Sequence, residues 1–71
     1  MWSQHELLAI KREIYTLKFR YEVEEFLARN YGLITQEING CWEYTRPGFD
    51  GWLIVRYERD CVISAAFGGL P

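Results

Sequence analysis

The sequence predicts a single α+β domain in which one long N-terminal helix is followed by an antiparallel β-meander of three to four strands. Two observations carry this prediction. No glycine or proline occurs before Gly32, and the apolar residues of this part recur at helical spacing. From residue 33 onward the apolar residues alternate, and turn-forming residues separate short runs of them. Residues 1–71 are treated as one domain, because no linker or repeat interrupts them.

The helix is expected to span residues 3–31. Ser3 and Glu6 have the spacing of a capping box, in which each side chain accepts a hydrogen bond from a backbone N–H group at the start of the helix. Gly32 suits the left-handed conformation that commonly ends a helix. These signals place both ends of the helix.

Apolar residues form two stripes on this helix, whereas a surface helix of a globular domain has one. The first stripe, expected to cover the sheet, contains Leu7, Ile10, Ile14, Leu17, Tyr21 and Ala28. The second stripe contains Leu8, Tyr15, Phe19, Val23 and Phe26. Its aromatic residues bury large areas when they pack, so this stripe is predicted to be the dimerisation surface of a homodimer. The alternative is that it packs against a loop or the tail of the chain.

The expected lengths of helix and sheet also indicate a second copy. A helix over residues 4–31 would be about 42 Å long at 1.5 Å per residue. Strands of six to eight residues reach only about 20–27 Å. The N-terminal part of the helix would therefore overhang the sheet, and small homo-oligomers are most often two-fold dimers that could cover it.

Strands are expected at about residues 33–38, 41–46, 52–58 and 61–67. Asn39-Gly40 is a strong signal for a two-residue hairpin between the first two strands. Arg59-Asp60 is not an ideal two-residue turn, so the register of the last strand stays open. The tail from Gly68 is expected to be loose.

An aromatic and basic sheet face follows from the expected pairing of Ile38 with Cys41 and of Arg46 with Trp52. One face then collects the residues predicted to bind a partner: Trp42, Tyr44, Arg46, Trp52 and Arg56. Trp, Tyr and Arg dominate protein-binding hot spots, which favours a partner protein. The same residues could stack on unpaired bases and contact phosphates of a single-stranded nucleic acid. They could also pack across strands beneath a helix or a dimer mate.

Composition and charge exclude several classes of protein to which this chain could otherwise belong. Hydrophobic residues make up 49% of the chain and charged residues 25%, which excludes a disordered tail. Eight basic and ten acidic residues give a net charge of −2, which counts against a surface that binds nucleic acid over most of its area. No apolar run approaches the ~18–20 residues of a membrane-spanning helix.

The cysteines and the N-terminus predict a cytoplasmic protein. Cys41 and Cys61 are too few for a disulfide-stapled miniprotein and lack C-x-x-C spacing, so they are interpreted as free thiols. The first residues do not have the features of a secretory signal. Together with His5, the cysteines are the only soft metal ligands, so neither a structural metal nor a cofactor is expected.

No set of residues in the sequence predicts catalysis. His5 lies in the first helical turn, and no cysteine or serine is placed to form a nucleophile pair with it. Glu43 is expected beside Val55 on the core face, where its carboxylate could act as an acid or base, although such residues more often reach water at a sheet margin. Asp50 is interpreted as a turn residue. The chain is therefore predicted not to be an enzyme.

The function predicted from the sequence is that of a small protein-binding regulator or inhibitor that acts as a homodimer through its aromatic sheet face. Size and acidic charge are shared with antitoxin-like proteins and with phage-encoded inhibitors of host defence, including anti-CRISPR proteins, which is an analogy only. Two alternatives stay open. One is a single-stranded nucleic-acid binder, and the other is a minor structural subunit of a larger assembly.

Overall fold

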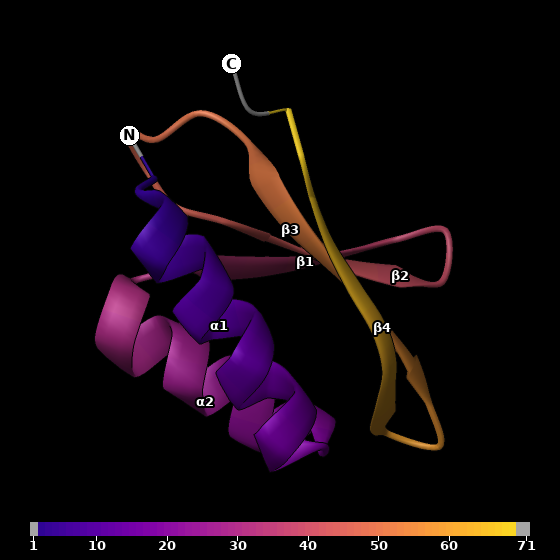
Figure 1. Ribbon diagram of the computed structural model, residues 1–71. Coiled ribbons are helices and arrows are strands. Elements are labelled where there is room, and N and C mark those ends of the chain that lie inside the picture. The colour runs from indigo at the N-terminus through magenta and orange to yellow at the C-terminus, as the bar shows by residue number, and fades with distance from the viewer. Residues whose placement is uncertain (1, 70–71) are drawn as a thin grey trace.

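Two helices lie on one face of a four-stranded antiparallel sheet in the computed structural model, which describes residues 2–69 (Figure 1). The elements in chain order are α1 (Gln4–Leu17), α2 (Arg20–Tyr31), β1 (Ile34–Ile38), β2 (Cys41–Thr45), β3 (Trp52–Glu58) and β4 (Cys61–Gly68). The strand order β1-β2-β3-β4 means that each strand pairs with its neighbours in sequence. The α+β class and the antiparallel meander are therefore confirmed. None of the helices in this part of the chain has the length and apolar character needed to cross a membrane.

The predicted start of the first helix is confirmed in detail. The Ser3 hydroxyl accepts a hydrogen bond from the Glu6 backbone N–H at 3.1 Å, and the Glu6 carboxylate accepts from the Ser3 N–H. Trp2, just before the cap, is buried and packs against Phe49 and Phe67. The capping box thus fixes the direction in which α1 enters the fold.

The prediction of one long helix is wrong, because the chain leaves the helical conformation between Leu17 and Arg20. Lys18 has a φ of 72°, and Phe19 is extended. A positive φ is unfavourable for a residue with a Cβ atom, so the surrounding structure must hold it in place.

Backbone bonds to the start of β4 hold this break. The Val62 N–H donates to the Lys18 carbonyl at 2.6 Å, and the Arg20 N–H donates to the Asp60 carbonyl at 2.8 Å. Between these bonds Phe19 forms an isolated antiparallel bridge with Cys61. The chain therefore exchanges helical hydrogen bonds for bonds to a strand that is distant in sequence.

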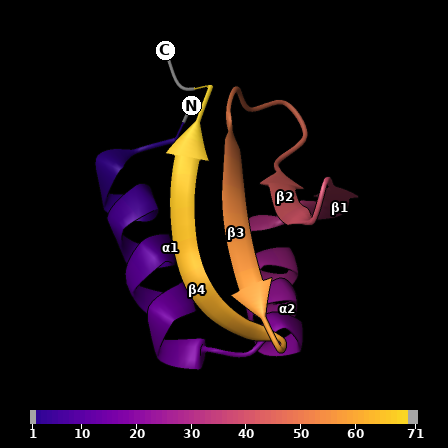
Figure 2. The same ribbon diagram turned by 90° about the vertical axis from the view of Figure 1, so that its right-hand side faces the viewer.

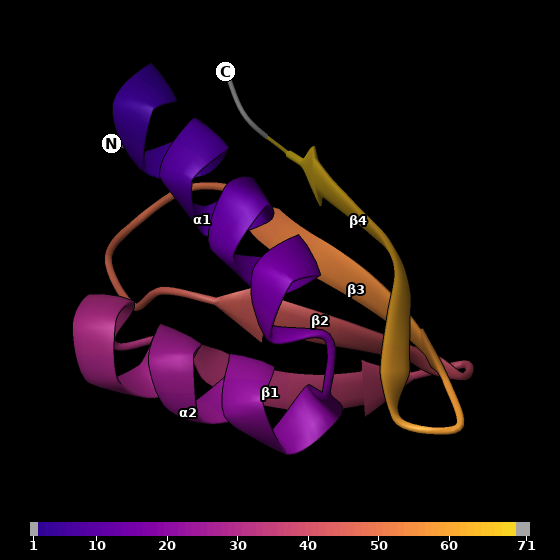
Figure 3. The same cartoon turned by 60° about the horizontal axis from the view of Figure 1, so that its bottom comes forward.

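The break also removes the overhang that a single helix would have. With 14 and 12 residues, the two helices are about 21 and 18 Å long. The seven and eight residues of β3 and β4 span about 23 and 26 Å. Both helices lie on the same side of the sheet (Figures 1 and 3), and α1 packs beside β4. The argument for a dimer from helix length is thus wrong, because the excess length folds back over the sheet.

The tight turns of the chain occur at the positions expected from the sequence. Gly32 is left-handed with a φ of 66° and ends α2. Asn39 and Gly40 both have positive φ, as a type I′ hairpin requires, and the pairing of Ile38 with Cys41 is confirmed.

The second two-residue turn settles the register of the last strand. Arg59 and Asp60 also have positive φ and join Glu58 directly to its partner Cys61. A shift in register between Arg56 and Tyr57 then leaves Ile63 without a partner on β3, which is the geometry of a β-bulge.

The expected pairing of Arg46 with Trp52 is wrong by one residue. Tyr44 lies opposite Leu53, and Trp42 lies opposite Val55. Because side chains alternate along a strand, this one-residue difference exchanges the faces of β2 relative to β3.

The core lies between the helices and the sheet face that they cover, which we call the inner face. It contains Trp2, Ile10, Ile14, Val23, Leu27, Leu33, Tyr44, Leu53, Val55 and Ala65. The opposite face, which we call the outer face, carries no helix in the described part of the chain (Figure 2). From the pairing, its residues are Ile34, Gln36, Ile38, Cys41, Glu43, Thr45, Trp52, Ile54, Arg56, Ser64 and Ala66.

Candidate functional site

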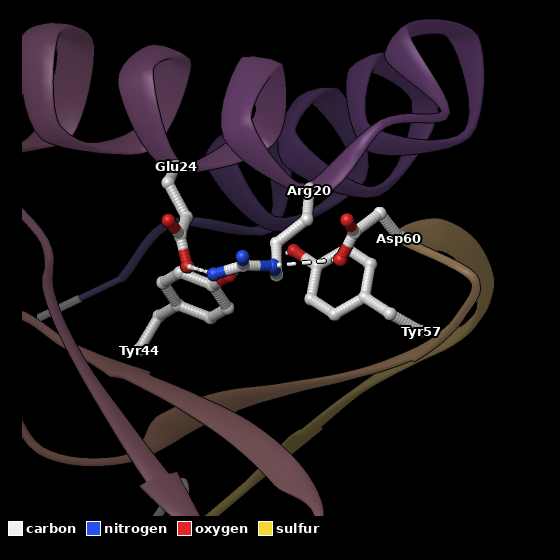
Figure 4. Close-up of polar contacts among 5 residues, drawn as sticks. All are labelled: Arg20, Glu24, Tyr44, Tyr57 and Asp60. Atoms are coloured by element: carbon white, nitrogen blue, oxygen red, sulfur yellow. Dashed lines mark hydrogen bonds and ion pairs between the residues drawn. The ribbon is translucent and has the colours of Figure 1, made fainter.

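A polar cluster of Arg20, Glu24, Tyr44, Tyr57 and Asp60 joins α2 to the inner face (Figure 4). The Tyr44 hydroxyl donates to the Glu24 carboxylate at 3.3 Å and lies 2.7 Å from the Tyr57 hydroxyl, with which it shares a hydrogen bond. Arg20 forms ion pairs with Glu24 at 3.5 Å and with Asp60 at 3.1 Å. The cluster thus connects α2 with β2, β3 and the turn before β4.

The electrostatics of this cluster favour a structural role. Burial raises the pKa of Tyr57 to about 12. Burial, assisted by the hydrogen bond to Tyr57, also raises the pKa of Tyr44. The hydrogen bond to Asp60 raises the pKa of Arg20, which therefore keeps its charge. At neutral pH both phenols stay protonated, so they can share hydrogen bonds but do not serve as bases.

Arginine side chains cover aromatic rings at two places on the helix side of the sheet. The Arg20 guanidinium lies 4.6 Å from the centre of the Trp42 ring. Arg46 lies 4.0 Å from the centre of the Phe49 ring and forms an ion pair with Glu6 at 3.3 Å. These contacts fasten the helices to the sheet and to the loop between β2 and β3.

The five residues predicted to bind a partner do not share one face, so that part of the prediction is wrong. Trp42, Tyr44 and Arg46 lie on the helix side, and Tyr44 is fully buried. Trp52 and Arg56 lie on the outer face and are exposed. The one-residue difference in register between β2 and β3 separates the two groups. Whether any of the five contacts a partner stays a prediction.

The predicted dimerisation stripe does not form a continuous surface either. Leu8, Tyr15 and Phe19 are exposed, whereas Val23 is fully buried and Phe26 is half-buried. The break at Lys18 changes the direction of the chain, so residues of α1 and α2 no longer share one helical face. Their role in dimerisation stays a prediction.

The residues considered for catalysis are also placed by the structure. Glu43 lies opposite Gln36 and Ile54 on the outer face, so its expected position on the core face is wrong. His5 and Asp50 are exposed. Within residues 2–69, no three His, Cys, Asp or Glu side chains gather as a metal site would require. Cys41 and Cys61 are free thiols and half-buried.

The outer face is the side of the sheet that no helix of the described residues covers (Figure 2), and several apolar side chains are exposed on it. Ile34 is 58% exposed, Ile38 is 41% exposed and Trp52 is 38% exposed. Ile54 lies between β2 and β4 and is half-buried. The polar side chains of Gln36, Glu43 and Thr45 lie among these apolar residues on the same face.

Two glycines hold the Trp52 side chain in place. A Cβ atom on Gly68 would lie 2.7 Å from the Trp52 ring, and one on Gly69 would lie 2.1 Å from it. The ring therefore lies directly against the backbone of these glycines, which cannot be replaced without moving it. Gly68 belongs to β4 and pairs with Trp52, so the expectation of a loose tail is wrong at this residue. Residues 70–71 lie outside the described residues.

The glycine pair is the signal that sequence reasoning missed. Consecutive glycines near the end of a strand permit close approach of an aromatic ring, and Trp52 is the residue that pairs with the first of them. Comparisons of the chain with protein-family models, with curated proteins and with solved structures found no significant match. The function must therefore be inferred from the surface of this chain itself.

Proposed function

We propose that this chain is a small, non-enzymatic, cytoplasmic protein-binding regulator or inhibitor that contacts its partner through the outer face. The single observation that carries the proposal is the exposed Trp52 ring, held against Gly68 and Gly69 on the sheet face that no helix covers. No cofactor enters this function.

The physical state of Trp52 supports its role as an anchor. Interface hot spots are enriched in tryptophan and arginine, and a side chain that is already ordered loses little entropy on binding. Trp52 meets this condition because one side of its ring rests on glycine backbone. Arg56 lies four residues further along β3 on the same face and is exposed. A partner with an apolar pocket beside a carboxylate would match this pair.

The sequence also suggested a single-stranded nucleic-acid binder. That function depended on five residues side by side, of which Trp52 and Arg56 occupy the outer face. With a net charge of −2, the chain supports a protein partner better than a phosphate backbone. Nucleic acid is therefore an outcome to be tested and not a second proposal.

The test uses a photo-crosslinking amino acid placed at Arg56 on the outer face and, as a matched control, at Arg12 on α1. Both positions are exposed, so neither substitution disturbs the core. In extracts of the native host, crosslinking from position 56 to another protein, with much weaker crosslinking from position 12, is the expected result. Equal crosslinking from both positions, or a product that nuclease removes, would overturn the proposal.

A further inference from the structure

The two edge strands of the sheet, β1 and β4, differ in whether other parts of the chain form hydrogen bonds with their open sides. Along β4, the Val62 N–H donates to the Lys18 carbonyl, and the Ala65 N–H donates to the Tyr15 hydroxyl at 3.1 Å. Lys18, between the helices, and Tyr15 of α1 thus cover parts of this edge. Along β1, no hydrogen bond from any other part of residues 2–69 reaches the side away from β2. Figure 2 shows β1 as the outermost strand on its side of the sheet.

The hairpin turn determines which groups of β1 are unpaired. In a type I′ hairpin the pair that closes the turn, here Ile38 with Cys41, is hydrogen-bonded. Hydrogen-bonded and non-hydrogen-bonded pairs alternate along an antiparallel ladder. The N–H and C=O groups of Thr35 and Glu37 therefore point away from β2, toward the open side.

Apart from its short length and the inward-facing charge of Glu37, β1 lacks the features that usually protect an edge strand. Lysine, proline and β-bulges prevent edge strands from pairing with other chains. The sequence of β1, Ile-Thr-Gln-Glu-Ile, contains neither lysine nor proline, and its pairing with β2 has no register shift. Its only charge is that of Glu37, and its two isoleucines are exposed on the outer face.

We propose that a second copy of this chain pairs antiparallel with β1, so that two four-stranded sheets become one eight-stranded sheet with a two-fold axis at Gln36. This inference rests on the proposed function, which assigns binding to the outer face. It goes further by naming the molecule that pairs with the open edge of β1. A symmetric pair of this kind uses the same surface on both copies.

Because β1 can pair with a copy of itself, its sequence indicates both the strand that pairs with it and the register of that pairing. With the axis at Gln36, Thr35 pairs with Glu37 of the second copy through the groups that point outward, and Ile34 lies opposite Ile38 of the second copy. Shifting the axis to Glu37 places two like charges opposite each other, which is destabilising. Shifting the axis to Thr35 places Ile34 opposite Gln36 and leaves Ile38 without a strand partner. Of these three axes, only the one at Gln36 places isoleucine opposite isoleucine.

The dimer would extend the outer face without a break. One Ile34–Ile38 pair would lie on each side of the Gln36 pair at the axis, on the same face as Trp52. A standard interface buries about 800 Å² per partner, and five-residue strands bury less than that. The association is therefore expected to be weak and to increase with protein concentration.

The first test measures the mass of the full chain by sedimentation equilibrium up to millimolar concentration. Ile34→Glu with Ile38→Glu places like charges opposite each other in the proposed register, and loss of the dimer is expected. Ile34→Glu with Ile38→Lys places opposite charges there, and the dimer is expected to persist with an affinity that falls with salt. Both side chains are exposed, so circular dichroism should show the same fold in all three proteins. A monomeric wild type, or equal association of the two variants, would overturn the inference.

The second test fixes the register in a background with Cys41→Ser and Cys61→Ser. Gln36→Cys places two thiols at the two-fold axis, where the Cα atoms of a non-hydrogen-bonded pair lie about 4.5 Å apart, within disulfide range. Mild oxidation should produce a covalent dimer. The matched control is Arg56→Cys, since β3 lies two strands from the axis and its thiols should not meet. Equal crosslinking of both variants would contradict the register.

The two proposals fail in different ways. A monomeric protein that still crosslinks to a different protein from position 56 would overturn the dimer and leave the proposed function standing. A dimer with the expected disulfide, but without crosslinking from position 56 to another protein, would overturn the proposed function and leave the self-pairing of β1 standing.

Discussion

The inner and outer faces of the sheet are built from the same four strands, yet they differ in what covers them. On the inner face Tyr44, Leu53 and Val55 are at most 1% exposed. On the outer face Ile34 and Trp52 are 58% and 38% exposed. Antiparallel sheets with one solvated face usually carry polar residues there. This chain carries isoleucine and tryptophan among the polar residues of that face, so part of its surplus of apolar residues lies outside the core.

The largest expected effect compares two neighbours on β3 that point to opposite faces. Leu53→Ala should lower the free energy of unfolding by about 2–5 kcal/mol, because it removes buried methyl groups and leaves a cavity. Ile54→Ala should lower it by about 1 kcal/mol or less, since the outer face is open to water and no closed cavity forms. Urea denaturation at low protein concentration measures both values. Equal losses would show that the two faces are buried alike.

Short local signals in the sequence are sufficient to predict where the helical region begins and ends and where the first hairpin turns. The capping box of Ser3 and Glu6, the helix end at Gly32 and the hairpin at Asn39-Gly40 are all as predicted. In each case a few adjacent residues determine the backbone conformation, so no distant contact is needed to recognise it.

The register between β2 and β3 could not be predicted in this way. The six residues 46–51 join these strands, and a loop of that length accommodates pairings that differ by one residue. Tyr44 lies on the inner face because its hydroxyl finds Glu24 and Tyr57 there while its ring is buried. The face on which Tyr44 lies therefore depends on contacts with α2, which is distant in sequence.

The break in the helix was missed for a similar reason. Lys18 has no intrinsic preference for a positive φ, and neither glycine nor proline marks the position. The hydrogen bond from Val62 to its carbonyl forms only when β4 is in place. Of the candidate site, the residue types of Trp52 and Arg56 predict a binding role, whereas the packing of Gly68 and Gly69 against the Trp52 ring follows only from the fold.

A smaller effect is expected from the polar cluster behind the inner face when the pH is raised. The pKa of Tyr57 in the folded chain is about 12, above its ordinary value of 10.0, and the pKa of Tyr44 is also raised. The stability from the neutral phenols is fully present below pH 10 and is lost as the pH rises toward 12. Tyr57 alone should account for about 1–2 kcal/mol, after allowance for solvent screening of a partly exposed group. Urea denaturation between pH 8 and 12 measures the loss.

The control for this effect separates the cluster from general alkaline denaturation. Tyr44→Phe removes one of the two phenols and should make the alkaline loss smaller, while costing about 1 kcal/mol at pH 8. Tyr31→Phe removes a hydroxyl that makes no hydrogen bond within residues 2–69 and should change neither value. An alkaline loss that is the same in all three proteins would contradict a role for the buried pair.

The smallest expected effect concerns the covered edge of the sheet. Tyr15 accepts a hydrogen bond from the Ala65 N–H on β4, so Tyr15→Phe should cost about 0.5–1 kcal/mol and leave this N–H to water. The sharper readout is hydrogen exchange, in which the Ala65 amide should lose protection while the amides of β3 keep theirs. Tyr21→Phe, at an exposed tyrosine on α2, is the matched control. If Ala65 stays protected in Tyr15→Phe, the tyrosine does not close this edge, and the contrast with β1 would rest on the segment between the helices alone.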